Sequence, residues 1–187
     1  MADIKNDFPF YTLWAKNLAM SYSLLVTGGA RSGKSRFAEE RALLRGTPLI
    51  YIATAQAFDE EMESRIKEHQ DRRGDEWQTI NEPLELAEAL RKTDGQGTCL
   101  VDCLTIWLSN LMFSEKDIPQ ATKALVNAIT TRQDDVIFVT NEVGAGIVPE
   151  NALARRFRDE AGRLNQTVAK TVDEVYACIS GMPLKLK

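Results

Sequence analysis

The chain has 187 residues, about the length of one domain with a small appendage, and 44% of them are hydrophobic, which is enough for a substantial core. Its 23 basic and 27 acidic residues give a net charge of −4, so the composition provides no overall basic surface for nucleic acid or for an anionic membrane. His69 is the single histidine, which excludes zinc sites built on several imidazoles and leaves one imidazole for catalysis.

Cysteine usage and hydropathy indicate the compartment. Cys99, Cys103 and Cys178 are odd in number and lie in or beside apolar runs, which favours buried thiols over a disulfide framework. No apolar stretch approaches the length of about 18 residues that a membrane helix needs, and residues 1–20 lack the pattern of a signal peptide. We therefore predict a cytoplasmic protein without membrane insertion, whose partner is a small molecule or another subunit.

Residues 1–20 form a mixed leader with weak patterning, and Met20 lies just before the first clear strand. Either the leader is a small packing arm, or Met20 is the true start; the pattern slightly favours the second interpretation. We expect a single domain over residues 21–187, with the leader outside it.

From residue 23 onward, short β-branched runs alternate with amphipathic stretches, which is typical of a mostly parallel sheet with crossover helices. Strands are expected at 23–27, 49–54, 98–102, 136–140 and 174–180, with candidate edge strands at 77–80 and 184–187. Helices are expected at 34–45, 60–72, 84–91, 105–113, 120–132 and 150–171. The last helix is supported by an apolar stripe of Leu153, Phe157, Ala161, Leu164 and Val168. The pattern predicts an α/β fold.

The strongest motif is GGARSGKS at residues 28–35, which fits G-x-x-x-x-G-K-[ST] between a predicted strand and a predicted helix. Its glycines allow backbone N–H groups to surround phosphate oxygens, and the helix N-terminus adds partial positive charge. Lys34 would reach the β- and γ-phosphates, and the Ser35 hydroxyl would ligate Mg²⁺. The placement of the motif favours phosphate binding over an ordinary glycine-rich turn.

Two further strands end in polar residues. The strand at 98–102 ends in Asp102, where a carboxylate could hold Mg²⁺ beside the phosphate loop, although many strands end in Asp as a turn residue. The strand at 136–140 leads into Asn141 and Glu142, and Glu142 could orient or deprotonate an attacking hydroxyl. A solvated turn explains the second pattern equally well.

His69 falls in the inward, apolar sector of the helix predicted near residues 60–73, together with Met62 and Ile66. Arg65 and Arg73 flank it by one turn on either side. A lone histidine on an apolar face is usually a packed core residue, but two flanking guanidinium groups favour a bound phosphate. The spacing alone leaves both interpretations open.

Beyond these motifs, the sequence resembles the bifunctional adenosylcobinamide kinase / adenosylcobinamide-phosphate guanylyltransferase family of cobalamin biosynthesis. The resemblance covers nearly all of residues 21–187. It rests on LLVTGGARSGKSRFAE (24–39), YIATAQAFDEEMESRIKEHQDRR (51–73), WQTINEP (77–83), VDCLTIWLSNL (101–111), VTNEVGAGIVPENALARRFRDEAGRLNQ (139–166) and the ending SGMPLKLK. It implies a P-loop NTPase-like (RecA-like) fold and a homo-oligomer, in the form of a trimer.

The resemblance implies two reactions at one nucleotide site. ATP or GTP phosphorylates the hydroxyl of the aminopropanol arm of adenosylcobinamide. GTP then guanylylates an enzyme histidine, pyrophosphate leaves, and the GMP passes to the new phosphate of adenosylcobinamide phosphate. The histidine of the family pattern R-I-x-x-H falls on His69, which would act as a nucleophile.

Site residues follow from the motifs and from position in the family pattern. The catalytic candidates are His69, Lys34 and Glu142, and the Mg²⁺ candidates are Ser35 and Asp102. Nucleotide contacts are expected from Gly28, Gly29, Ala30, Arg31, Ser32, Gly33, Lys34, Ser35, Ala53, Thr54, Ala55, Gln70, Asp71, Arg72, Arg73, Asn81 and Asp102. Asn81 stands where the family usually has Glu, a departure that bears on nucleotide affinity and selectivity rather than on reaction type.

Two alternatives remain open. The chain could be a monofunctional P-loop kinase for another small alcohol, with a structural His69. A GTP-binding regulatory protein is less favoured, because it needs an N-K-x-D sequence for base recognition and the strand end at Asn141 reads N-E-V-G.

Overall fold

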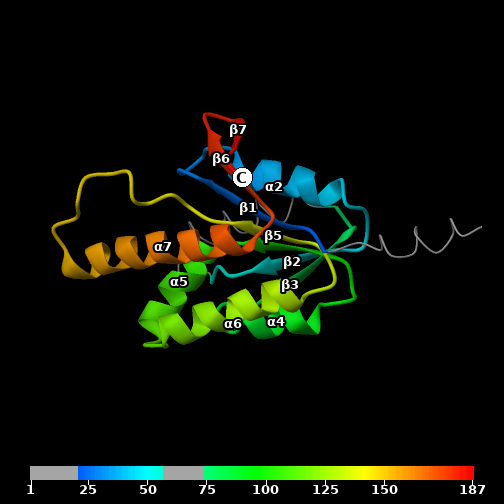
Figure 1. Cartoon of the computed structure of the whole chain (residues 1–187), viewed down its shortest axis with the longest axis horizontal. Coiled ribbons are helices and arrows are strands. Elements are labelled where there is room, and N and C mark those ends of the chain that lie inside the picture. The colour runs from blue at the N-terminus through cyan, green and yellow to red at the C-terminus, as the bar shows by residue number, and fades with distance from the viewer. Residues whose placement is uncertain (1–20, 57–73) are drawn as a thin grey trace, which may run out of the picture.

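The computed structural model describes residues 21–56 and 74–187. Within these residues a seven-stranded sheet has the order β3-β2-β4-β5-β1-β6-β7 (Figure 1). Six strands pair in parallel, and β7 joins the edge antiparallel to β6. The strands are β1 (Ser23–Gly28), β2 (Leu49–Ala53), β3 (Trp77–Asn81), β4 (Thr98–Asp102), β5 (Val136–Val139), β6 (Glu174–Ile179) and β7 (Met182–Lys185). The expected α/β fold with a mostly parallel sheet is confirmed.

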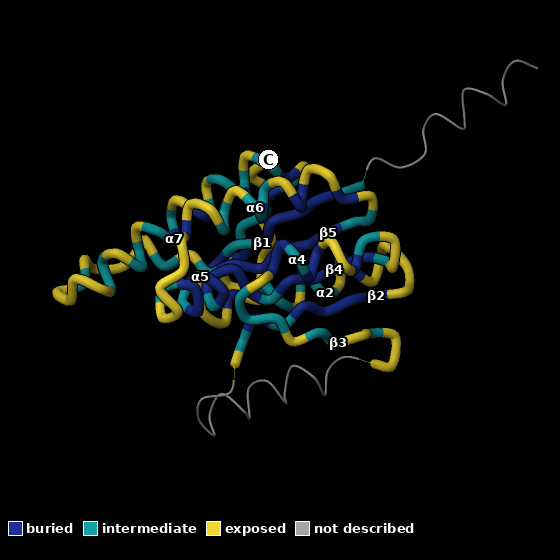
Figure 2. The backbone as a smooth tube through the Cα atoms, turned by 90° about the horizontal axis from the view of Figure 1, so that it is seen from below, coloured by how far each residue is buried: buried dark blue, intermediate teal, exposed yellow. Residues whose placement is uncertain are grey.

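Helices cover both faces of this sheet. One face packs against α2, and the other packs against α4, α5, α6 and α7, so the central strands are buried from both sides (Figure 2). The helices are α2 (Lys34–Leu43), α4 (Leu86–Lys92), α5 (Leu104–Phe113), α6 (Ile118–Thr131) and α7 (Ala152–Thr171). Burial on two faces explains why the central strands read as continuous apolar runs rather than as alternating patterns.

The two faces have separate apolar clusters. Leu24 and Val26 of β1 pack toward Ala38 of α2, whereas Leu25 of the same strand packs toward the α7 side, which includes Leu164. This alternation follows from the two-residue period of a strand. The sheet is therefore the rigid centre from which the loops at its carboxyl edge extend.

The predicted bounds of the described elements agree with the structure within two residues, and two of the largest differences have local causes. The last strand runs over Met182–Lys185 rather than 184–187, because Ser180 and Gly181 form a two-residue turn with φ values of 51° and 82°. Helix α6 begins before residue 120 because the Asp117 side chain accepts a hydrogen bond from the backbone N–H of Gln120. The helix predicted at 60–72 lies outside the described residues.

The stripe predicted on the last helix is partly confirmed. Ala161, Leu164 and Val168 are buried, and Phe157 packs against the same core. Leu153 is 53% exposed, so the stripe does not pack against the core along its whole length. It lies in the first turn of α7, at the end of the helix that extends away from the sheet (Figure 2).

Two composition-based predictions can also be compared with the structure. Cys99, Cys103 and Cys178 are buried free thiols, as expected. In the described segments, no helix combines the length and the apolar character that crossing a membrane requires.

Candidate active site

The carboxyl ends of the parallel strands bring the predicted polar residues to one edge of the sheet. Asn81 on β3 and Asp102 on β4 both pair with Ala53 on β2, so these three positions form one row across three strands. Asp102 pairs onward with Val139 at the end of β5. Because ligands bind beyond the carboxyl ends of such sheets, this edge is the candidate site.

The phosphate loop follows β1 at the same edge and needs glycine at two positions. A Cβ on Gly28 would lie 2.5 Å from the Ser32 Oγ and 2.6 Å from the carbonyl oxygen of Cys178. Gly33 has φ of 90° where it precedes α2, and a Cβ there would lie 3.2 Å from the Cα of Gly181. Both glycines thus permit a tight turn that a larger residue would obstruct.

Polar groups of this loop are available to an anion. Gly33 offers no side chain to cap the N-terminus of α2, so backbone N–H groups there remain open to a ligand. The Ser32 Oγ is buried and has no hydrogen-bond partner in the described part of the chain. The Lys34 ammonium donates to the Gly29 carbonyl at 3.3 Å, which keeps it folded over the loop. A phosphate group would satisfy all three kinds of donor.

The β6–β7 hairpin supports the phosphate loop from the side. The backbone N–H of Gly181, in the hairpin turn, donates to the Ser32 carbonyl at 3.0 Å. The ending SGMPLKLK therefore lies next to the loop although about 150 residues separate them in the sequence. A contact between distant backbone groups leaves no residue pattern, so the role of this ending could not be predicted from the sequence.

Asp102 is partly exposed at the end of β4, and Tyr51 orients it. The Tyr51 hydroxyl donates to the Asp102 Oδ2 at 3.1 Å, and the Tyr51 ring meets the Trp77 ring edge-on, with centroids 6.2 Å apart. The pKa of the neighbouring Cys103 thiol is raised to about 12, chiefly by burial and then by the Asp102 charge, while the Lys34 charge opposes the rise. The Tyr51 hydroxyl therefore holds the Asp102 carboxylate at the carboxyl edge of the sheet.

Ser35 and Asp102 have the donor chemistry that Mg²⁺ requires. Mg²⁺ bound with nucleotides takes one or two protein oxygens and completes its coordination with phosphate oxygens and water. Ser35 is on the first turn of α2, which packs over β4 and β5. Residues 21–56 and 74–187 contain no cluster of three or more His, Cys, Asp or Glu side chains able to hold a metal alone. The hydroxyl and the carboxylate therefore fit a metal that arrives with a nucleotide.

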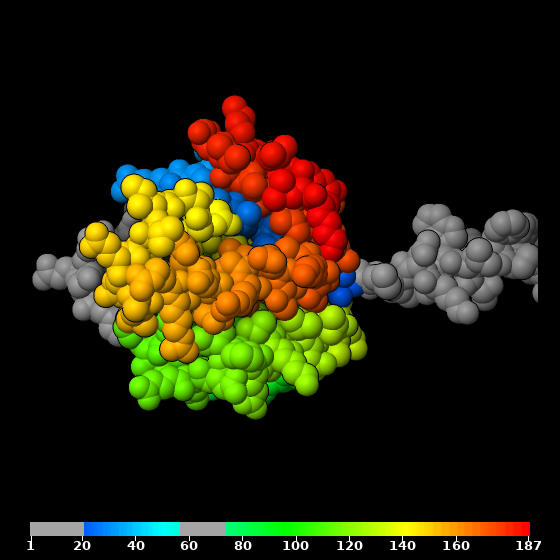
Figure 3. All heavy atoms as spheres, turned by 60° about the vertical axis from the view of Figure 1, so that its left-hand side comes forward, coloured from blue at the N-terminus to red at the C-terminus, as the bar shows by residue number. Residues whose placement is uncertain are grey.

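Glu142 lies beside the first residue of the phosphate loop. Its backbone N–H donates to the Gly28 carbonyl at 3.1 Å, and its exposed carboxylate accepts from the backbone N–H of Gly144 at 2.8 Å. Figure 3 shows the segment that follows β5, in yellow, against the blue segment around the phosphate loop. A side chain at this position can face a substrate that approaches the loop.

Comparison with known proteins identifies the group to which this arrangement belongs. Residues 24–186 match the family described as cobinamide kinase / cobinamide phosphate guanyltransferase, so the match spans the sheet, the phosphate loop and the closing hairpin. The chain belongs to this family. The resemblance noted from the sequence motifs is thereby confirmed.

Individual members of the cobinamide kinase family are similar over most of the chain. The bifunctional adenosylcobalamin biosynthesis protein CobP of Pseudomonas aeruginosa is 47% identical over 168 residues, which cover 87% of this chain and 96% of the relative. The proteins named CobU from Salmonella typhimurium and Escherichia coli K12 are 42% and 40% identical, each covering 88% of this chain and 99% of the relative. Among solved structures, the RadB recombinase matches 90% of this chain and 79% of its own, with 14% identity and a TM-score of 0.45.

The structure describes only some of the predicted site residues. His69, Gln70, Asp71, Arg72 and Arg73 lie outside the described residues. Among the described positions, Gly29, Ala30, Arg31 and Asn81 are exposed, and Ala53 and Ala55 are partly exposed at the carboxyl edge. Their contacts with nucleotide stay predictions.

The side chain of Thr54 bonds to the protein backbone. It is fully buried, and its Oγ1 donates to the Cys103 carbonyl and accepts from the Cys103 N–H, both at 2.8 Å. Asn110 in α5 donates to the Thr54 carbonyl at 2.9 Å. The Thr54 hydroxyl therefore links the end of β2 to the residue after β4. A nucleotide contact of Thr54 stays a prediction, and both hydrogen bonds of its hydroxyl go to Cys103 instead.

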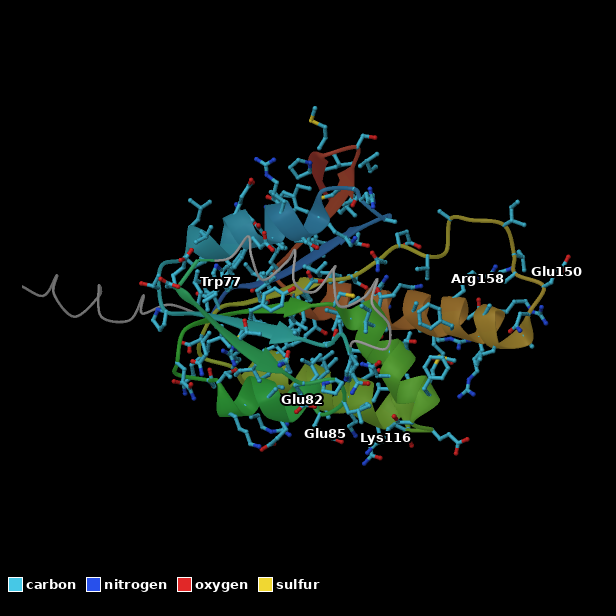
Figure 4. All side chains as sticks on the ribbon, turned by 180° about the vertical axis from the view of Figure 1, so that it is seen from behind. Trp77, Glu82, Glu85, Lys116, Glu150 and Arg158 are labelled. Carbon is cyan, nitrogen blue, oxygen red and sulfur yellow. The ribbon has the colours of Figure 1, made fainter. Side chains whose placement is uncertain are left out.

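Glu82 does not take the place of the carboxylate missing at Asn81. Its Oε1 accepts from the backbone N–H groups of Leu84 and Glu85, at 3.0 and 2.8 Å, at the approach to α4. Figure 4 shows Glu82 near Glu85 and Lys116, toward the α4 side of the sheet. The effect of Asn81 on nucleotide binding therefore stays a prediction.

Proposed function

We propose that this chain phosphorylates adenosylcobinamide with ATP or GTP, and then transfers GMP from GTP, through a covalent intermediate on His69, to give adenosylcobinamide-GDP and pyrophosphate. Membership of the cobinamide kinase / cobinamide phosphate guanyltransferase family supports this activity. The observation that carries it structurally is the convergence of the phosphate loop, Asp102 and Glu142 at one edge of the sheet.

The first reaction is a phosphoryl transfer at this edge. The substrate hydroxyl oxygen forms a bond to the γ-phosphorus, the bond from that phosphorus to the bridging oxygen breaks, and the nucleoside diphosphate leaves. Lys34 and the loop N–H groups hold the phosphates, and Glu142 accepts the hydroxyl proton. Mg²⁺, held by Ser35 and Asp102, would neutralise charge on the phosphate oxygens.

The second reaction is a nucleotidyl transfer in two displacements. A nitrogen of neutral His69 forms a bond to the α-phosphorus of GTP, and pyrophosphate leaves. A phosphate oxygen of adenosylcobinamide phosphate then forms a bond to the same phosphorus, and the P–N bond breaks to free the imidazole. A covalent intermediate divides one difficult transfer into two easier ones.

The remaining parts of the proposal concern the setting of the enzyme. We place it in the cytoplasm as a homo-oligomer, a trimer by its resemblance to the family, with no nucleic-acid partner. The net charge of −4 supports the last point, because a nucleic-acid surface is normally basic.

The experiment that tests the second reaction is labelling with α-labelled GTP and Mg²⁺. The wild type is expected to carry acid-labile, base-stable label, and His69→Asn to carry none while it still phosphorylates adenosylcobinamide. Absence of label on the wild type would refute the guanylyltransferase half and favour a monofunctional kinase with a structural His69. Label that persists in His69→Asn would show that another residue is the nucleophile.

A second variant tests whether one site serves both reactions. Lys34→Ala removes the ammonium that the phosphate loop directs at the nucleotide, so phosphorylation and labelling of His69 should both be lost. Retention of labelling in Lys34→Ala would indicate two separate nucleotide sites.

A further inference from the structure

Four hydrogen bonds form a closed ring at the end of β5. The backbone N–H of Asn141 donates to the Thr105 Oγ1 at 2.7 Å, and the hydroxyls of Thr105 and Thr140 are 3.1 Å apart. The Thr140 hydroxyl donates to the Asn165 Oδ1 at 2.7 Å. The Asn165 amide nitrogen then donates to the Asn141 carbonyl at 3.2 Å, so the chain of bonds returns to the residue where it began.

The groups of the ring determine which atom donates and which accepts in each hydrogen bond. The Asn141 carbonyl can only accept, so the Asn165 amide must turn its NH₂ group toward it and its oxygen toward Thr140. Because the Thr140 hydroxyl donates its hydrogen to Asn165, the Thr105 hydroxyl must donate to Thr140, and it accepts from the Asn141 N–H. Each hydroxyl donates once and accepts once. Hydrogen bonds in such a chain polarise and strengthen one another.

The ring joins three elements, and its two threonine hydroxyls are on buried residues. Thr105 is in the first turn of α5, Thr140 and Asn141 follow β5, and Asn165 is in α7. Thr105 and Thr140 are 7% and 1% exposed. Water cannot readily replace a lost partner at such a depth, so each bond depends on the others.

Two residues of the ring are close in sequence to the two carboxylates of the site. Asp102 ends β4 three residues before Thr105, and Glu142 directly follows Asn141. The Glu142 N–H donates to the Gly28 carbonyl of the phosphate loop. Hydrogen bonds hold both the N–H and the carbonyl of Asn141. The backbone dihedral angles that lead from Asn141 to Glu142 are therefore restricted.

We propose that Thr105, Thr140 and Asn165 are positioning residues for phosphoryl transfer, which act by holding Asn141 so that Glu142 faces the substrate hydroxyl beside the phosphate loop. This inference rests on the proposed function, in which Glu142 accepts the proton of that hydroxyl. Guanylylation of His69 has no such proton to remove, because the nucleophile is a neutral imidazole. The ring should therefore matter to the first reaction and much less to the second.

The test replaces one hydroxyl of the ring. Thr105→Val has nearly the same shape but offers no acceptor to the Asn141 N–H, and Thr105→Ser keeps the hydroxyl. In Thr105→Val, kcat for phosphorylation should fall about 10- to 100-fold, the loss typical of a misplaced catalytic group, while the KM for nucleotide and the labelling of His69 change by less than about threefold. Thr105→Ser should restore most of the activity. Thr130→Val is the control, because in the described residues the Thr130 hydroxyl bonds to carbonyls of its own helix.

A double-mutant cycle separates action through Glu142 from general damage. Glu142→Gln should lower kcat for phosphorylation on its own. If the ring acts through Glu142, adding Thr105→Val to Glu142→Gln should cost no more than about a further twofold. An equal loss from Thr105→Val in both backgrounds, or a parallel loss of His69 labelling, would overturn the proposal.

Amide hydrogen exchange provides a readout that needs no substrate. In Thr105→Val, the N–H groups of Asn141 and Glu142 should exchange at least about tenfold faster than in wild type, and Thr105→Ser should not show this change. Unchanged exchange would overturn the proposal. A wild type that does not phosphorylate adenosylcobinamide would instead refute the proposed function, and the exchange rates would then decide whether the ring holds Asn141.

Discussion

Thr54 offers the sharpest test of how the site is supported. Thr54→Val removes a hydroxyl that both donates to and accepts from the backbone of Cys103, the residue after Asp102. The Cys103 carbonyl keeps a second partner, the Trp107 N–H at 3.1 Å, but the Cys103 N–H would have none from this side chain. The substitution therefore leaves a buried donor without its acceptor where β2 and β4 end.

The expected loss of stability follows from those contacts. A buried N–H without a partner costs about 1 to 3 kcal/mol, and the lost hydroxyl donor adds about 1 kcal/mol. Thr54 is fully buried, so solvent cannot compensate. The free energy of unfolding of Thr54→Val should fall by about 2 to 4 kcal/mol, a large part of the stability of a typical domain.

Urea unfolding followed by tryptophan fluorescence measures this loss, because Trp107 is buried on the neighbouring helix α5. Thr54→Ser is the matched control: it keeps both hydrogen bonds and loses one methyl group, at a cost of about 1 kcal/mol. An equal loss of stability in the two variants would show that Thr54 contributes by packing, and would refute the argument from hydrogen bonds.

Three further predictions concern the loop, the metal and the hairpin. Gly33→Ala places a Cβ at φ of 90°, so nucleotide affinity measured by calorimetry should fall at least tenfold, and unchanged affinity would show that the loop adapts. Tyr51→Phe removes a hydrogen bond to Asp102, so the Mg²⁺ concentration that half-saturates nucleotide binding should rise about tenfold, with no change in EDTA; an equal change in EDTA would contradict this role. The hydrogen bond from Lys185 to Glu174 holds the pKa of Glu174 below its ordinary value of 4.5, so this carboxylate stabilises the fold above that pH and the contribution is lost as pH falls through the lower, folded value. Urea unfolding should show Glu174→Gln to be less stable by up to about 1 kcal/mol at pH 7 and by almost nothing near pH 3, and a loss that does not depend on pH would argue against the ion pair.

The sequence predicted the central fold well because burial on both faces leaves a strong pattern. The strand 98–102 was predicted with its observed bounds, and it lies between two other strands with apolar clusters on both sides. The edge strand β7 was misplaced by two residues because it has little burial to define it. Its register depends on the turn at Ser180 and Gly181 instead.

The site was predicted less completely, for a reason that concerns distance along the chain. The phosphate loop, Asp102 and Glu142 each follow a strand, so their convergence could be inferred from the parallel sheet. Thr54 was predicted to contact nucleotide, but its hydroxyl bonds to the backbone of Cys103, and a bond to backbone leaves no pattern of residue types. Asn165 could have been suspected as a polar residue directly after Leu164 in the apolar stripe of α7, but nothing local identified its partners.

The contacts that could not be predicted from the sequence share one arrangement. They connect the ends of neighbouring strands, beyond the last paired residues of the sheet. Thr54 joins β2 to the residue after β4, and the ring that contains Thr105 joins the start of α5, which follows β4, to the end of β5. The Glu142 N–H joins the segment after β5 to the loop after β1. Gly181 then joins that loop to the β6–β7 hairpin. The bonds of Thr54 and Thr105 fix Cys103 and Asn141, which lie next to Asp102 and Glu142, rather than the carboxylates themselves. Substitution of the Thr54 or Thr105 hydroxyl should therefore weaken catalysis without removing either carboxylate, and kcat should respond more than nucleotide affinity.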